Sequence, residues 1–294
     1  MKDINDFLAG TCARIEATLD RCLPSESEEP VHLHQAMRYS LMGGGKRLRP
    51  ALCLASACAV GGKDEAALIP AAALEIFHTY TLIHDDLPAM DDDLLRRGRP
   101  TCHIAFNEAT AILAGDALLT LAFRLLCDVS CQPPYTPTDL VRELATAGGS
   151  TGVIGGQMAD IEGEGKPMSL DQLLYIHTHK TGDLIRASVR LGAMTVGATA
   201  DHLEALTRYA EKVGLAFQIA DDVLNATGDE KALGKAAGTD AVAGKMTYVA
   251  AYGIDDAKVR AKTLLSEAKA ELDQLPGDAE ILKDLADYVI NRNK

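Results

Sequence analysis

The chain has 294 residues, 47% apolar and 24% charged, which is the composition of an ordinary globular protein near the size limit of one hydrophobic core. Its formal net charge of −13 and aromatic content of 4%, with no Trp, argue against nucleic-acid binding, which needs cations for phosphates and rings for base stacking. No uninterrupted run of about 20 apolar residues predicts a membrane span. Residues 1–10 lack the basic and apolar regions of a signal peptide.

Most of the chain is predicted to be helical, because Ala, Leu and Glu are abundant and apolar residues recur three and four positions apart. Leu68, Ala72 and Ile76 are an example, and no sustained alternation predicts a sheet. The predicted loops, rich in Pro, Gly or polar residues, are 22–30, 131–137, 163–169 and 228–244. Helices joined in this way predict an all-α bundle with one shared core, a single domain over residues 1–294.

The seven cysteines are an odd number and form no CxxC pair. Several of them, such as Cys53 and Cys58, lie in apolar runs. This pattern predicts free thiols in a reducing cytoplasm rather than a disulfide framework or a zinc site.

Two acidic clusters, DDLPAMDDD (85–93) and DDVLN (221–225), follow strongly apolar helical segments. Carboxylates at this density repel one another, and their hard oxygens favour Mg²⁺ or Mn²⁺. The alternative is a charged helix end or a surface turn. An EF-hand is excluded, because Met90 stands where its central Gly would be.

Basic residues form islands in this acidic chain, at GGGKRLRP (43–50) and LLRRGRP (94–100). Arg matches phosphate oxygens in a bidentate manner, and Gly permits close backbone approach. The glycines do not form a P-loop, since GxxxxGK[ST] is absent. Lys180, Lys235 and Lys245 lie beside small residues, and each by itself is more typical of a surface lysine. Together with the acidic clusters they indicate a site for Mg²⁺ and a diphosphate.

Helical spacing places His78, seven residues before Asp85, on the face that carries Asp85. On an unbroken helix Asp85 would face Asp92 rather than Asp91. Pro88 cannot continue a regular helix without losing a hydrogen bond, so a local bulge there is the way in which Asp91 could reach that face. One face of the second helix is predicted to carry Gln218, Asp221, Asp222 and Asn225.

These motifs resemble those of the trans-isoprenyl diphosphate synthase family, close to bacterial farnesyl diphosphate synthases, over nearly the whole chain. The segments that carry the resemblance are YSLMGGGKRLRP (39–50), HTYTLIHDDLPAMDDDLLRRGRPTCH (78–103), GGQMADIEGEG (155–165), HKTGDLIRA (179–187), FQIADDVLN (217–225), LGKAAGTD (233–240), GKMTY (244–248) and INRNK (290–294). The resemblance implies an all-α bundle around a deep central cavity, working as a cytoplasmic homodimer. It implies condensation of isopentenyl diphosphate with dimethylallyl or geranyl diphosphate.

Residue by residue, the resemblance implies three groups of ligands. The Mg²⁺ ions, for which Mn²⁺ can substitute, would be held by Asp85, Asp86, Asp91, Asp221 and Asp222. The allylic diphosphate would be bound by Arg96, Lys180, Lys235 and Lys245. The isopentenyl diphosphate would be bound by Lys46, Arg49, His78 and Arg97. The implied catalytic groups are Asp85, Asp86, Arg96, Lys180, Thr181, Gln218 and Asp221, with the Thr181 and Gln218 oxygens near a carbocation. Residues 228–244 and 291–294 are candidates for closing the cavity.

Tyr80 and Thr81, five and four positions before Asp85, are the candidates that set product length. An aromatic residue at the position of Tyr80 implies farnesyl diphosphate, with geranyl or geranylgeranyl diphosphate as the alternatives. Asn225 departs from the family pattern DDxxD, since it keeps a carbonyl ligand but loses a charge.

Other classes of protein explain less of the sequence. A terpene cyclase would need no second diphosphate pocket, which leaves Lys46, Arg49 and Arg97 unexplained. A non-catalytic, prenyl-diphosphate-binding regulatory subunit would tolerate loss of Asp85 or Arg96, and both are present. An acidic helical cation-binding protein would need none of the basic motifs.

Overall fold

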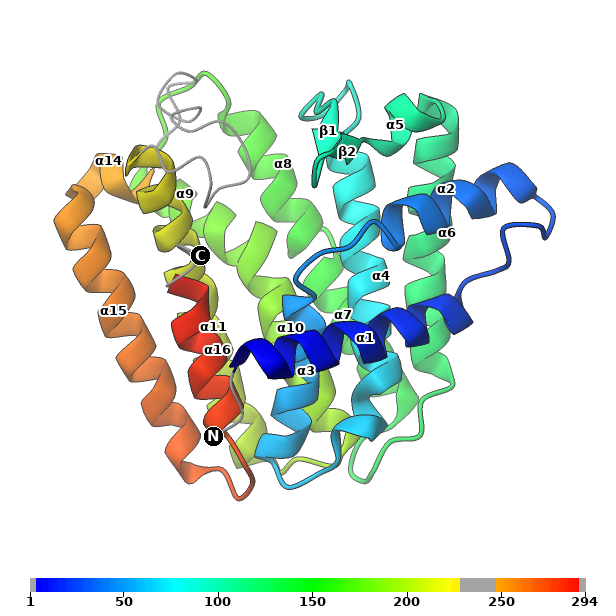
Figure 1. Ribbon diagram of the computed structural model, residues 1–294. Helices are drawn as coiled ribbons and strands as arrows, with labels where there is room; N and C mark the ends of the chain where they lie inside the picture. Colours follow the sequence, from blue (N-terminus) through cyan, green and yellow to red (C-terminus); the bar gives the residue numbers. More distant parts are fainter. Residues whose placement is uncertain (1–3, 228–246, 291–294) are drawn as a thin grey trace.

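The computed structural model describes residues 4–227 and 247–290, and these form a bundle of helices (Figure 1). The first half contains α1 (Ile4–Cys22), α2 (Val31–Leu41), α3 (Leu48–Ala59), η1 (Asp64–Ala67), α4 (Leu68–Asp85), β1 (Leu95–Arg96), β2 (Arg99–Pro100), α5 (Cys102–Ala105), α6 (Glu108–Cys127) and α7 (Pro137–Gly148). The second half contains α8 (Val153–Gly163), α9 (Leu170–Ile176), η2 (His177–Gly182), α10 (Asp183–Thr195), α11 (Ala200–Thr227), α14 (Tyr248–Tyr252), α15 (Ile254–Glu271), η3 (Leu272–Gln274) and α16 (Glu280–Ile290). The predicted all-α class is confirmed.

The core lies among upright helices, with α4 against α6, α3 against α10, and α10 against α11. In Figure 1, α1 crosses the front of these helices. Leu52, Ile76 and Tyr209 are each 0% exposed and belong to one continuous apolar cluster. The Tyr209 hydroxyl donates to the Leu282 carbonyl at 2.6 Å, so even this buried polar atom is satisfied.

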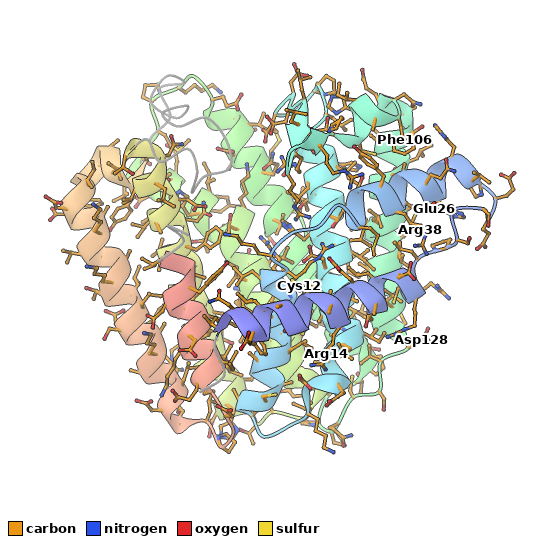
Figure 2. All side chains as sticks on the ribbon, in the orientation of Figure 1. Cys12, Arg14, Glu26, Arg38, Phe106 and Asp128 are labelled. Carbon is orange, nitrogen blue, oxygen red and sulfur yellow. The ribbon has the colours of Figure 1, made fainter. Side chains whose placement is uncertain are left out.

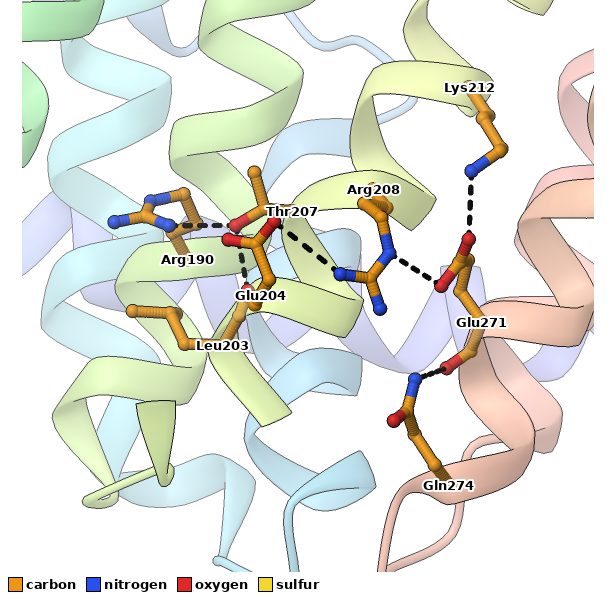
Figure 3. Close-up of polar contacts among 8 residues, drawn as sticks. All are labelled: Arg190, Leu203, Glu204, Thr207, Arg208, Lys212, Glu271 and Gln274. Atoms are coloured by element: carbon orange, nitrogen blue, oxygen red, sulfur yellow. Dashed lines mark hydrogen bonds and ion pairs between the residues drawn. The ribbon is translucent and has the colours of Figure 1, made fainter. Parts of the chain in front are cut away.

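Ion pairs hold the outer helix α15 against α11. Figure 3 shows the Glu271 carboxylate of α15 accepting from Arg208 and from Lys212 of α11, each at 2.8 Å. Arg208 also approaches Glu204 at 3.4 Å. All these groups have access to solvent, so the pairs fix geometry more than they add stability.

The central helix α4 is buried on nearly every side, as its apolar sequence requires. Pro70 lies in its first turn, where a missing N–H breaks no hydrogen bond. The helix ends at Asp85, and Pro88 follows three residues later. The C-terminal end of α4 lies at the upper end of the bundle in Figure 1, together with the β1–β2 hairpin, α8 and α9.

By length and composition alone, two helical stretches in the described ranges could cross a membrane. They are Asp64–Asp85, with a mean hydropathy of 1.4, and Glu108–Cys127, with 1.7. Of these windows, 67% and 33% are buried inside the bundle. A core helix of a bundle passes the same test, so the stretches are weak evidence for a span.

A wide helical turn, the π-helix η2, joins α9 to α10 and was not predicted from the sequence. The capping box of Ser169 and Gln172 starts α9, and η2 follows that helix directly. A Cβ on Gly156 of α8 would lie 2.2 Å from the Lys180 backbone nitrogen. The absence of a side chain at Gly156 therefore allows η2 to pack closely on α8. Single π turns of this kind are frequent at functional sites.

Candidate active site

The first acidic cluster folds back on the end of α4. The Asp91 N–H donates to the Asp85 carbonyl at 2.9 Å, and the Asp92 N–H donates to the Leu87 carbonyl at 3.2 Å. Asp92 has a φ of 52°, in the left-handed region that a tight turn needs. The return at Pro88 thus brings Asp91 to Asp85, the residue that the family resemblance implied, whereas the spacing of an unbroken helix favoured Asp92.

Crowding perturbs the Asp85 carboxyl. Burial raises its pKa to about 6; the nearby Lys180 and Arg96 charges lower it, and the Asp91 carboxylate raises it. Asp85 is half-buried, whereas Asp91 is exposed. The Asp85 and Asp91 carboxylates repel each other at the C-terminal end of α4, and a bound cation would relieve this repulsion.

The neighbouring Asp86 is buried and paired with the hairpin. Arg96 donates to its Oδ1 from Nε at 2.6 Å, with Nη2 2.5 Å away. Arg96 Nη2 also lies 3.3 Å from Asp93 Oδ2. Burial raises the pKa of Asp86 while the Arg96 charge opposes it. Asp86 therefore holds Arg96 at the site.

The second acidic cluster lies on α11, with Asp222 and Asn225 buried and Gln218 and Asp221 half-buried. Asp222 Oδ2 accepts the Tyr248 N–H at 2.6 Å, which attaches α14 to this helix. The same oxygen lies 3.9 Å from His177 Nε2. Burial lowers the pKa of His177 to about 4, so this imidazole is neutral at pH 7.

Lys180 and Thr181 lie on η2, and both are half-buried. Lys180 Nζ donates to Asp160 Oδ2 of α8 at 2.7 Å. Burial acts to lower the pKa of Lys180, but Asp160 and Asp85 outweigh it, and the net pKa is raised. Lys180 thus stays charged, and its coupling to Asp85 shows that η2 and the end of α4 face one site.

Asp160 was missed by the sequence reasoning, although it lies in the quoted segment 155–165. The sequence feature that could have identified Asp160 is its position in that segment, three residues after Gln157 on the same predicted helix. The Gln157 side-chain nitrogen is buried and has no hydrogen-bond partner among residues 4–227 and 247–290. It is a donor placed next to the site that a bound molecule can satisfy.

The glycine loop and the hairpin contact each other. The Arg97 guanidinium donates to the Gly44 carbonyl. Gly45 has a φ of 131°, and a Cβ there would lie 2.6 Å from Arg97 Cζ, so only glycine permits this contact. The exposed Lys46 lies over the Tyr288 ring of α16, 5.6 Å from its centroid.

His78 is close to two of the cations predicted with it. Burial lowers its pKa well below the ordinary value, and the charges of Arg49 and Arg97 lower it further. The structure thus brings His78, Arg49 and Arg97 together and keeps the imidazole neutral.

Tyr80, on α4, is 5% exposed. Its ring meets Phe77 edge-on at 4.8 Å and His84 edge-on at 5.6 Å. Thr81 is half-buried, and its hydroxyl donates to the His78 carbonyl at 2.7 Å. The ring of Tyr80 is therefore held in one orientation, about one helical turn below Asp85.

Some predicted residues lie outside the described part of the chain, namely Lys235, Lys245 and the proposed closing segments 228–244 and 291–294. Within residues 4–227 and 247–290, no group of three or more His, Cys, Asp and Glu side chains is arranged to hold a metal ion. A cavity of about 50 Å³ is lined by Asp86, Arg96 and Arg97, among others. The deep central cavity stays a prediction.

Comparison with known proteins identifies the family. The polyprenyl synthetase family model matches residues 30–285. The farnesyl diphosphate synthase of Escherichia coli (strain K12) is 50% identical over 267 residues, which are 88% of this chain and 89% of that protein. The geranylgeranyl diphosphate synthase of Cyanophora paradoxa is 44% identical over 284 residues, 95% of this chain and 93% of that protein.

The fold gives the same answer. The crystal structure of an FPP/GFPP synthase from Zymomonas mobilis superposes with a TM-score of 0.87 at 36% identity, and the match covers 98% of each chain. The resemblance drawn from the motifs is confirmed. The chain belongs to the polyprenyl synthetase family, and it is a prenyltransferase.

Proposed function

We propose that the chain condenses isopentenyl diphosphate with dimethylallyl and then geranyl diphosphate, releasing diphosphate and giving farnesyl diphosphate. The observation that carries this proposal is the convergence of Asp85, Asp91, Arg96 and Lys180 at the end of α4. Hard carboxylate oxygens beside fixed cations suit a metal-bound diphosphate. The name of the relative from E. coli, at 50% identity, supports the farnesyl product.

The donor set fits Mg²⁺. All the groups are oxygens, and Mg²⁺ usually takes only one or two carboxylates, keeping waters and substrate phosphates as its other ligands. Asp85 and Asp91 would hold Mg²⁺ at one side of the site, and Asp221 and Asp222 would hold further Mg²⁺ at the other. When bound, Mg²⁺ supplies charge neutralisation of the diphosphate leaving group.

The side chains of the protein orient the two substrates. Arg96 and Lys180 neutralise the allylic diphosphate as its C–O bond breaks. The isopentenyl double bond then forms the new C–C bond, and the proton it loses leaves with the departing diphosphate. The oxygens of Thr181 and Gln218 direct their dipoles at the carbocation.

Lys46, Arg49 and Arg97 hold the second diphosphate, with neutral His78 as an uncharged hydrogen-bonding group. This second set of cations distinguishes the reaction from that of a terpene cyclase. The presence of Asp85 argues against a silent regulatory subunit, because such a subunit needs no catalytic carboxylate.

Product length is proposed to be set by Tyr80. Its ring, fixed against Phe77 and His84, would close the apolar path of the growing prenyl chain after three isoprene units. The relative from Cyanophora paradoxa keeps geranylgeranyl diphosphate as the alternative. Geranyl diphosphate is the second alternative.

A homodimer is proposed through the outer face of α6. This helix is the more apolar of the two long apolar stretches, yet only 33% of its window is buried. Ile112 and Leu113 are 44% and 57% exposed. An apolar surface of this kind is typical of an interface.

The seven cysteines are free thiols, which supports a reducing, cytoplasmic location.

The proposed reaction is tested by mass spectrometry of the products. Purified protein is incubated with isopentenyl and dimethylallyl diphosphate, with Mg²⁺ or with EDTA. Farnesyl diphosphate formed only with Mg²⁺ is the expected result. A longer product would reject the role of Tyr80 but keep the reaction. No condensation by folded protein, with either dimethylallyl or geranyl diphosphate, would favour the silent subunit.

A further inference from the structure

Arg99, the last cation of the basic hairpin, has no part in either proposed diphosphate site. It lies on β2, opposite Arg96 in the strand register. Its guanidinium carbon lies 4.2 Å from the centroid of the Tyr39 ring, a cation–π contact between the hairpin and α2. A Cβ on Gly43 would lie 3.3 Å from Arg99 Nη1, so Arg99 also reaches the start of the glycine loop.

Tyr39 makes a second contact with the same strand. Its hydroxyl donates to the Pro100 carbonyl at 2.8 Å. The Tyr39 ring also meets Phe106 edge-on at 5.5 Å, and Phe106 meets His32 at 5.2 Å. Figure 2 shows Phe106 just above α2, in the upper part of the bundle. The Tyr39 ring is therefore held between α2, Phe106 and the hairpin.

The hairpin needs such support. Each strand has two residues and is largely exposed, and a two-stranded hairpin is marginally stable by itself. Its other side-chain contacts are the ion pairs of Arg96 with Asp86 and Asp93 and the hydrogen bond from Arg97 to the Gly44 carbonyl. A bound diphosphate and its metal compete for these charges. The contacts of Tyr39 involve none of these groups, so they persist when a diphosphate and its metal are bound.

We propose that Tyr39 and Arg99 are a positioning pair. They fix the hairpin against α2 and thereby set the distance between the Arg96 side of the site and the glycine loop that carries Lys46. Neither residue touches substrate. The inference rests on the proposed roles of Arg96, Arg97 and Lys46. Its rival is that Arg99 binds diphosphate directly, and the two make different predictions when both residues are changed.

A double-mutant cycle separates the two. The variants are Tyr39→Leu, Arg99→Gln and their combination, with Tyr39→Phe and Arg99→Lys as conservative changes. Arg142→Gln, which removes a side chain that is 67% exposed on α7, is the matched control. The measurements are kcat, the KM of each substrate, Tm, and the affinity for inorganic diphosphate with Mg²⁺ by calorimetry.

Each single non-conservative variant should raise the KM for isopentenyl diphosphate and the Kd of inorganic diphosphate by about tenfold, with a smaller change in kcat. The double variant should be no worse than either single one, because the contact can be lost only once. Tyr39→Phe and Arg99→Lys should recover most of the affinity, and Arg142→Gln should match the wild type.

Losses that multiply in the double variant would overturn the proposal. A loss of affinity in Arg99→Gln that Tyr39→Leu does not share would also overturn it and would assign Arg99 to the diphosphate. An unchanged KM and Kd in both single variants would also overturn it. If Tyr39→Leu fails to fold, Arg99→Gln should still raise the Kd of inorganic diphosphate by about tenfold while Arg99→Lys and Tyr39→Phe keep most of the affinity, and an unchanged Kd in Arg99→Gln would then overturn the proposal. If the wild type condenses no substrates, the proposed function is rejected. The affinities for inorganic diphosphate, measured by calorimetry, then still test the positioning role of Tyr39 and Arg99. A wild type that binds no diphosphate would overturn both.

Discussion

The three cations between residues 46 and 49 lie in three different environments. Lys46 is exposed, Arg49 is half-buried, and the Arg47 side chain is 0% exposed. Arg47 Nη1 lies 2.6 Å from Glu75 Oε1 of α4, and Nη2 donates to the Leu41 carbonyl at 2.8 Å. Arg47 therefore anchors the glycine loop to the central helix.

Breaking this buried pair should be costly. Glu75→Gln leaves the Arg47 charge buried without its counter-ion, which typically destabilises a protein by about 3–5 kcal/mol. Urea unfolding followed by circular dichroism measures the change. Glu280→Gln, at a carboxylate that is 69% exposed, should stay within about 0.5 kcal/mol of the wild type. Equal losses in the two variants would contradict the assignment.

Tyr80→Ala should lengthen the product. The change removes the ring that is proposed to block the prenyl chain, and geranylgeranyl or longer diphosphates should replace farnesyl diphosphate in mass spectra. Tyr80→Phe keeps the ring and should keep the product. An unchanged product from folded Tyr80→Ala protein would show that Tyr80 is only a core residue.

Asn225→Asp should strengthen the dependence on Mg²⁺. Asn225 is 6% exposed, so a carboxylate there adds a buried charge next to Asp221 and Asp222. Without metal its Tm should fall below that of the wild type, and Mg²⁺ should raise it more than it raises the wild type. The Mg²⁺ concentration for half-maximal rate should fall. Identical Mg²⁺ titrations in both assays would reject a metal site at this face.

At the scale of elements, the turn η2 depends on a close approach of α8. Gly156→Ala would place a methyl group 2.2 Å from the Lys180 nitrogen and 2.7 Å from the His179 carbonyl carbon, both backbone atoms that must shift. Because a displacement of about 1 Å can cost about a hundredfold in rate, kcat/KM should fall by about that factor.

The control for Gly156→Ala is Gly10→Ala in α1, where a Cβ meets nothing within 4 Å. That variant should keep full activity and gain about 0.5–1 kcal/mol of stability from the better helix propensity of Ala. Comparable activity of the two variants would show that η2 tolerates displacement.

At the scale of the whole molecule, the apolar face of α6 should decide the assembly. Leu113→Glu places a charge on that face and should convert a dimer to a monomer in light scattering after size exclusion. Val259→Glu, at a residue 63% exposed on α15, should leave the dimer intact. A wild type that elutes as a monomer would contradict the proposed dimer. One continuous core supports the expectation of a single domain.

The sequence by itself determined the helical class and the family, because both depend on local information: a 3.6-residue apolar period and motifs read from consecutive residues. It also favoured Asp91 over Asp92, because the resemblance implies Asp91 as the ligand and Pro88 interrupts the helix that would have presented Asp92. Tertiary structure decided the rest. The burial of Arg47, the neutral state of His78 and the Lys180–Asp160 pair arise where segments distant in sequence meet. Burial and charge at such meetings are set by the packing of the bundle, which no local pattern records.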